Sequence, residues 1–282
     1  MGTITDDQAM TVLDVDGDQV AYTDSGGTGT PLLLLHAGVF GSWFAPLATE
    51  PALDGHRVIR VLRAGYTAGP APSRPLSMAD HAAHAAAVLD ALGVCDAHVA
   101  GHSSSTEIVL QLALDRPDLV AALILSEPPL VDSLADPADL DVLHATLGPV
   151  IGAAMGAFAA GDIASAYDAF MGGVCGPEHR SVLAAALGAD AVTRAEQDSR
   201  FFFADEVRAA NMWTFDAATA ARVTQPVLLV QGGESPAPTH RLVAHLAGML
   251  PDARIATIEG DNHLLPLRSP AALAELVAGF AG

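Results

Sequence analysis

Apolar and polar residues alternate along the first part of the chain, in MTVLDVDGDQVAYTDSG (residues 10–26). Alternation with a period of two is typical of strands with one solvent-facing side, and Asp16-Gly17 at its centre predicts a hairpin. Further on, PLLLLHAG (residues 31–38) is a continuous apolar run that ends in small residues, as a buried parallel strand does. The pattern therefore predicts an N-terminal hairpin followed by the interior of a sheet.

Strand-like and helix-like patterns alternate after this run. The segments with strand patterns are HRVIRVL (56–62), DAHVAG (96–101) and AALILS (121–126). The segments with helical spacing are SMADHAAHAAAVLDALGV (77–94), which begins with a capping serine, and the stretch from Thr106 to Arg116. Alternation at this spacing predicts an α/β fold in which helices cover a mostly parallel sheet.

The alternation stops after Pro129 and resumes at QPVLLVQGGESP (residues 225–236). The intervening chain is rich in alanine and glycine and has helical stretches but no strand pattern. Its most apolar run, residues 147–160, is too short and glycine-rich for a membrane span and predicts a buried helix. We therefore expect one core domain from residues 1–130 and 223–282, with residues 131–222 inserted as a helical cap.

Composition narrows the classes of partner. The chain has 282 residues, of which 51% are hydrophobic, and its 33 acidic residues against 13 arginines with no lysine give a net charge of −20. Such a surface repels nucleic acids and anionic membranes. The first ten residues show no secretory signal, so a cytoplasmic location is expected, and a homodimer is compatible with the sequence. Cys95 and Cys175 are expected to be free packing residues, and no metal or cofactor is implied.

Three consecutive serines lie between a predicted strand and a predicted helix, in HVAGHSSSTEIVLQLALDRP (residues 98–117). A nucleophile on such a sharp turn needs small residues two positions before and two positions after it, because strand and helix approach each other there. Only Ser103 meets this condition, with Gly101 and Ser105 at those positions. The stretch is also compatible with a serine-rich helix cap.

A base and an oxyanion hole can be assigned to other strand ends. His263 lies in the loop IEGDNHLLPLRSP after the last predicted strand, from which a base can reach a serine on another strand. Backbone amides must hold the oxyanion, one from the residue after the nucleophile, Ser104, and one from the loop HAGVF. In that loop we favour Gly38 over Val39 as the donor.

The acid that should orient the base is ambiguous. Glu127 directly follows an apolar strand, where a carboxylate is costly to bury without a partner. Glu234 follows the strand after the cap, one position before Ser235, which stands where an acid is more usual. Asp261 is a poorer third candidate. The residues alone rank Glu127 first and leave Glu234 as the alternative.

The motifs HAG (36–38), GHSSS (101–105) and GDNH (260–263), together with the helical insertion, resemble the α/β-hydrolases over nearly the whole chain. SEPP (126–129) is similar to zearalenone-type lactone hydrolases, whose acid follows the sixth strand. That resemblance implies Ser103 as nucleophile, His263 as base and Glu127 as acid. Haloalkane dehalogenases and epoxide hydrolases resemble the fold but need aspartate at the nucleophile position.

These features predict a serine hydrolase that needs no cofactor and cleaves an ester or lactone of a mostly apolar small molecule through an acyl-enzyme. Thioester hydrolysis, acyl transfer and C–C bond hydrolysis would use the same triad, and a non-catalytic binding protein could keep the same pocket. The candidate pocket residues are Val39, Phe40, Trp43, Tyr66, Met212 and Trp213.

Overall fold

Eight strands form one sheet in the computed structural model, which describes residues 10–67, 69–133 and 137–280. Their order in the sheet is β1-β2-β4-β3-β5-β6-β7-β8. The strands are β1 (Thr11–Val15), β2 (Asp18–Asp24), β3 (Thr30–Leu35), β4 (His56–Leu62), β5 (Ala97–His102), β6 (Val120–Ser126), β7 (Val227–Gly232) and β8 (Ala253–Ile258). The predicted α/β class with an N-terminal hairpin is thus confirmed.

The sheet has an antiparallel edge and a parallel interior. β1 and β2 pair antiparallel through a turn at Asp16 and Gly17, which both have positive φ, at 54° and 93°. Two positive φ angles are what a two-residue hairpin turn requires. β2 also pairs antiparallel with β4, and the remaining pairs, from β4 through β8, are parallel. The carboxyl ends of six parallel strands therefore meet at one edge of the sheet.

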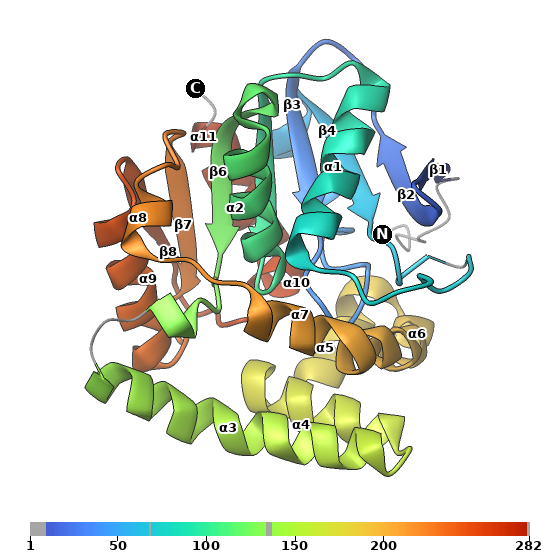
Figure 1. Cartoon of the computed structure of the whole chain (residues 1–282), viewed down its shortest axis with the longest axis vertical. Coiled ribbons are helices and arrows are strands. Elements are labelled where there is room, and N and C mark those ends of the chain that lie inside the picture. The colour runs from blue at the N-terminus through green and yellow to red at the C-terminus, as the bar shows by residue number, and fades with distance from the viewer. Residues whose placement is uncertain (1–9, 68, 134–136, 281–282) are drawn as a thin grey trace.

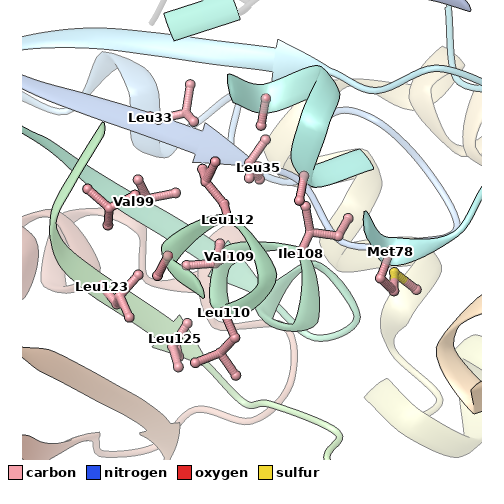
Figure 2. Close-up of a cluster of buried hydrophobic side chains, with 14 of the residues drawn as sticks. Leu33, Leu35, Met78, Val99, Ile108, Val109, Leu110, Leu112, Leu123 and Leu125 are labelled. Carbon is pink, nitrogen blue, oxygen red and sulfur yellow. The ribbon is translucent and has the colours of Figure 1, made fainter. Parts of the chain in front are cut away.

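Helices cover both faces of the sheet (Figure 1). The helices of the core are α1 (Met78–Leu92), α2 (Ser105–Asp115), α9 (Ala237–Met249), α10 (Leu265–Arg268) and α11 (Pro270–Phe280). α1 begins at a capping box built by Ser77 and Asp80 and ends at Gly93 in the left-handed conformation. Figure 2 shows how α2 packs on the sheet, with Val109 and Leu112 toward the strand residues Val99 and Leu123, and Ile108 toward Met78 of α1.

The chain between β6 and β7 forms a second layer across the carboxyl ends of the strands, where the arrowheads in Figure 1 point. Its helices are α3 (Pro137–Ala159), α4 (Ile163–Cys175), α5 (His179–Leu187), α6 (Ala189–Phe201) and α7 (Val207–Met212). The short helix α8 (Ala217–Ala220) follows on the way to β7 and lies beside the sheet (Figure 1). A π-helical turn, Phe202–Glu206, joins α6 to α7. We call this layer the cap.

α3 differs from the predicted buried helix. It is longer than the apolar run, residues 147–160, from which it was predicted, and most of its residues are half-buried or exposed. Leu147, Ile151 and Met155, spaced four residues apart, face inward, so only one stripe of the apolar run is covered. Within the described chain, α3 alone is long and apolar enough to cross a membrane by length and composition, over Ala138–Ala159.

Three buried histidines are expected to make the stability of the fold depend on pH. His36, His81 and His102 have pKa values well below the usual one, first because burial disfavours the charged ring. Arg63 lowers the pKa of the first two further, and His263 does so for His102. Below about pH 6.5 the unfolded chain therefore binds protons that the folded chain does not, and stability rises with pH in that range.

We expect the free energy of unfolding, measured by urea denaturation, to fall from about pH 7 to about pH 5, by up to about 1.4 kcal/mol per pH unit for each such histidine. The ring nitrogens of His81 make no hydrogen bond to the described residues. His81→Leu therefore removes one titrating group without removing a hydrogen bond, and the pH dependence should become shallower. An equal or steeper dependence in this variant would contradict the assignment.

Candidate active site

Ser103 stands on the turn between β5 and α2 with a φ of 52°, in the left-handed region that most residues avoid. Its amide donates to the carbonyl oxygen of Ser126 at 2.9 Å. A side chain at Gly101 would lie 2.8 Å from Val109 Cγ2 and 2.9 Å from the carbonyl oxygen of Ser105, too close for any Cβ. Strand and helix thus approach as closely as the sequence argument for Ser103 requires.

Ser105, in the place of a more usual glycine, is part of the turn. Its hydroxyl accepts the amide of His102 at 2.8 Å and lies 2.7 Å from the carbonyl oxygen of Leu35, to which it donates. The hydroxyl therefore ties the start of α2 to both β5 and β3. The extra side chain is accommodated because it makes hydrogen bonds that a glycine could not.

His263 contacts Glu127 beneath the cap. The carboxylate can only accept, so the His263 Nδ1–H donates to Glu127 Oε2, at 3.0 Å. The other carboxylate oxygen, Oε1, accepts the amide of Gly232 at 2.8 Å and the hydroxyl of Ser235 at 2.5 Å. This hydrogen bond keeps the proton of the neutral ring on Nδ1. The other ring nitrogen, Nε2, therefore has a free lone pair that can accept a proton.

The charge of Glu127 is stabilised although only 2% of its side chain is exposed. Burial raises the pKa of Glu127, but the hydrogen bond and charge of His263, the Ser235 hydroxyl and the Gly232 amide together lower the pKa below its usual value. Glu127 itself has a φ of 49°, another left-handed residue at a strand end. The carboxylate is therefore ionised at neutral pH.

The other two candidate acids lie elsewhere. Glu234 is exposed, and its amide donates to the carbonyl oxygen of Asp261. The Asp261 carboxylate is buried and accepts the amide of Asn262. Of the three carboxylates considered from the sequence, Glu127 is thus the one that lies against His263.

His102 contacts both the backbone and the ring of His263. Its Nε2–H donates to the carbonyl oxygen of His263 at 3.0 Å, and the two rings lie 4.6 Å apart. The ring of Trp43 lies 4.7 Å from that of His102. The loop that carries His263 is therefore fixed both at its carboxylate contact and at its backbone.

The loop predicted to supply the oxyanion hole lies against the elbow. The Gly38 amide donates to the Ser104 hydroxyl at 2.9 Å, which in turn donates to Glu206 Oε1 at 2.9 Å. Val39, next in the loop, has a φ of 75°. The two residues expected to provide oxyanion amides, Gly38 and Ser104, are thus in direct contact.

Glu206 and Arg63 are site residues that the sequence interpretation missed. Both oxygens of the Glu206 carboxylate accept Arg63 Nη2, at 2.9 and 3.1 Å, and the Tyr66 hydroxyl donates to the same carboxylate. Arg63 follows a buried strand, and a buried cation needs an anion. That was the available signal, but nothing in the sequence pointed to a partner 143 residues away.

Ser103 and His263 open onto one cavity of about 380 Å³ between core and cap. A volume of this size suits a small molecule. The lining is mostly apolar, and the cap residues with large apolar side chains in it include Leu147, Ile151, Met155, Phe170, Phe202 and Phe203. Glu107, on the first turn of α2, brings a carboxyl group to the wall.

Half of the predicted pocket residues line this cavity, namely Val39, Trp43 and Trp213. Phe40, Tyr66 and Met212 are not among the residues that line it. Phe40 is buried behind the cavity wall, stacked on Trp43, and Tyr66 is buried in the cluster around Glu206. Met212 points to solvent and is 68% exposed, because it lies on the outer side of α7.

Neither cysteine has the surroundings of a nucleophile or a metal ligand. Cys175 is buried and lines the cavity, and burial raises the pKa of its thiol, so that it stays protonated. Cys95 is exposed, which contradicts its prediction as a packing residue. Both thiols are free, and the described residues contain no cluster of three or more potential metal ligands.

Comparison with known proteins places this geometry in a family. A family model described as the alpha/beta hydrolase family matches residues 32–276. The chain belongs to the α/β-hydrolase family. It is 38% identical over 107 residues to the "Putative carbamate hydrolase RutD" of Azorhizobium caulinodans, a match covering 38% of this chain and 40% of that protein. The matched region thus spans less than half of this relative.

Solved structures of other α/β-hydrolases share the fold over nearly the whole chain. The enol-lactonase of Burkholderia xenovorans LB400 aligns with a TM-score of 0.77 at 17% identity, covering 96% of this chain and 99% of that one. The esterase RhEst1 of Rhodococcus sp. ECU1013 aligns with a TM-score of 0.75 at 21% identity, covering 96% and 98%. Est816, described as degrading N-acyl homoserine lactones, aligns with a TM-score of 0.71 at 24% identity, covering 96% and 100%. At these identities the likeness establishes the fold.

The two candidate acids can be separated by substitution. We expect Glu127→Ala to lower kcat by about 10³-fold or more, because His263 then loses the partner that fixes its tautomer. Glu234→Ala, on the exposed side of the β7 loop, should leave kcat within about twofold. Steady-state kinetics on a chromogenic ester would measure both, and the reverse ranking would place the acid after the cap.

Proposed function

We propose that this protein is a serine hydrolase that cleaves a carboxylic ester or lactone of a mostly apolar small molecule. The observation that carries the proposal is the arrangement of three residues around one cavity. Ser103 on its strained turn and His263 line the same cavity, and His263 is held by a buried, ionised Glu127. This is the constellation that activates a serine hydroxyl.

In the first half of the reaction, Ser103 Oγ attacks the acyl carbon and its proton passes to His263. Glu127 stabilises the resulting imidazolium without taking the proton. We expect the Ser104 amide to hold the oxyanion of the tetrahedral intermediate, and the Gly38 amide, which donates to the Ser104 hydroxyl at 2.9 Å, to join it on releasing that hydroxyl. His263 then protonates the leaving alkoxide oxygen as the C–O bond breaks, which leaves the acyl group on Ser103.

In the second half, water attacks the acyl-enzyme. His263 takes a proton from that water, and the tetrahedral intermediate collapses to release the acid and return the proton to Ser103. With a lactone, acid and alcohol remain on one molecule. The chain's own residues supply every group in this sequence, and no cofactor is required.

The cavity supports a neutral, largely apolar substrate. Its described lining contains no arginine, the chain has no lysine, and Glu107 contributes an acidic group. An anionic substrate would find no counter-charge there. The names of the relatives, a carbamate hydrolase, lactonases and an esterase, share attack on an acyl carbon that bears a heteroatom leaving group. Thioester hydrolysis, acyl transfer and C–C bond hydrolysis would use the same triad. Substrates for these reactions should therefore be tested together with esters and lactones.

A fluorophosphonate probe tests the nucleophile. We expect stoichiometric labelling of the intact protein, seen as a mass increase, and no labelling of Ser103→Ala. Ser105→Gly, which restores the more usual elbow residue, serves as the matched control and should still be labelled. Labelling that survives Ser103→Ala, or tight ligand binding without labelling or turnover, would contradict the proposal.

A further inference from the structure

Glu107 brings a carboxyl group into the wall of the cavity. It lies on the first turn of α2 and is only 4% exposed. It lines the same cavity as Ser103 and His263, in a wall that is mostly apolar. Burying a carboxyl group is costly unless it meets hydrogen-bond donors. In ligand pockets, the few polar groups of an apolar wall are the ones that fix the orientation of the ligand.

The start of α2 determines how far this carboxyl group lies from the reacting atoms. The Thr106 amide donates to the carbonyl oxygen of Ser103 at 2.9 Å, and the Glu107 amide donates to that of Ser104 at 3.2 Å. Helical winding therefore begins at the elbow itself. Residues four apart in a helix lie on one face, with Cβ atoms about 6 Å apart. Glu107 is thus about one helical turn from the nucleophile.

The same face of α2 continues from Glu107 to Trp213. Gln111, four residues after Glu107, accepts the indole N–H of Trp213 at 2.8 Å. Trp213 also lines the cavity. Glu107 therefore lies between Ser103 and the contact of Gln111 with Trp213. A substrate that has its acyl carbon at Ser103 and extends along α2 lies against the Glu107 carboxyl group.

The other polar side chains of the wall have different surroundings. The hydroxyl of Ser133 donates to the carbonyl oxygen of Leu130 at 2.6 Å. His144 and Asn211, on cap helices, are exposed to solvent. Among the described lining residues without a role in the proposed reaction, Glu107 is thus the buried one that has a polar side chain.

We propose that Glu107 is a specificity-determining residue, which accepts a hydrogen bond from a hydroxyl or amide N–H group of an otherwise apolar ester or lactone. This inference rests on the proposed hydrolase function. A carboxyl group can accept in either protonation state, and its several lone pairs allow it to accept from a substrate in addition to the protein. The donor should lie within about four bonds of the acyl carbon, because Ser103 and Glu107 are one helical turn apart.

The expected selectivity comes mainly from rejection of the wrong substrate. An apolar group in this part of the cavity would cover the carboxyl group without offering a donor, which is unfavourable. Sites that hydrogen-bond a substrate hydroxyl discriminate strongly against an analogue that lacks it, because the polar group of the protein is then left unpaired. Glu107 should therefore select between substrates of equal size.

Two pairs of esters of nearly equal shape test this selectivity. The first pair is the nitrophenyl esters of β-hydroxybutyric acid and isovaleric acid, in which a hydroxyl replaces a methyl group in the acyl part. The second pair is β-hydroxypropyl butyrate and isobutyl butyrate, in which the same replacement is in the alcohol part. We expect kcat/KM to favour the hydroxyl ester by about 30-fold or more in at least one pair.

Substitution of Glu107 should remove this preference. In Glu107→Leu we expect the ratio of the two kcat/KM values to fall by about 30-fold, in part because kcat/KM for the methyl ester rises. A role of Glu107 in folding alone would lower both values together and leave their ratio unchanged. Glu107→Gln keeps an acceptor oxygen and should give an intermediate ratio.

Asp115→Asn is the matched control, because it removes a carboxylate from the exposed end of the same helix, away from the cavity wall. The asparagine oxygen can still accept from Gln111, whose Nε2 lies 2.8 Å from the Asp115 carboxylate. Both ratios should remain those of the unaltered protein in this variant.

Ratios near one in both pairs, or a preference that persists in Glu107→Leu, would overturn the inference. If Glu107→Leu does not fold, Glu107→Gln decides, since a neutral acceptor forms a weaker hydrogen bond and should lower the preference about threefold or more. The proposed function is tested separately. A protein that hydrolyses both members of each pair equally and reacts with the fluorophosphonate keeps that function, and one that does neither loses it.

Discussion

The hydrogen bond between Glu127 and His263 is the interaction on which the site depends. A carboxylate directly after a buried strand could not remain charged without donors, and it has three, from two different elements. Two of these, Gly232 and Ser235, come from the exit of β7. The end of β7 and its following loop therefore stabilise Glu127, the proposed acid, and the loop after β8 carries His263, the proposed base.

This arrangement explains why the acid was ambiguous in the sequence while the nucleophile was not. Ser103 is selected by sterics within five residues, a local constraint that sequence expresses directly. The choice between Glu127 and Glu234 depends on which side chain turns inward where two neighbouring strands end. Ser235 stands where an acid is more usual, and its hydroxyl becomes a donor to Glu127. Counting positions along one strand could not reveal a role that depends on the adjacent strand.

The parts that escaped prediction are those set by long-range packing. The order of strands and helices along the chain follows from local periodicity. The start of α1 follows from the capping residue Ser77. The orientation of α3, the direction of Met212 and the partner of Arg63 depend on how the cap settles on the core. The cap helices lack the alternation that fixes a sheet face, so their apolar runs specify helices but not which side is covered.

Two buried carboxylates lie next to the candidate catalytic residues, Glu127 against His263 and Glu206 against Ser104. The wall of the cavity adds Glu107 and, among its described residues, no arginine. For an ester substrate this has a consequence at the end of the cycle. Hydrolysis converts a neutral guest into a carboxylate inside a protein of net charge −20. For the proposed hydrolase, these acidic surroundings would favour departure of the acid and limit product inhibition.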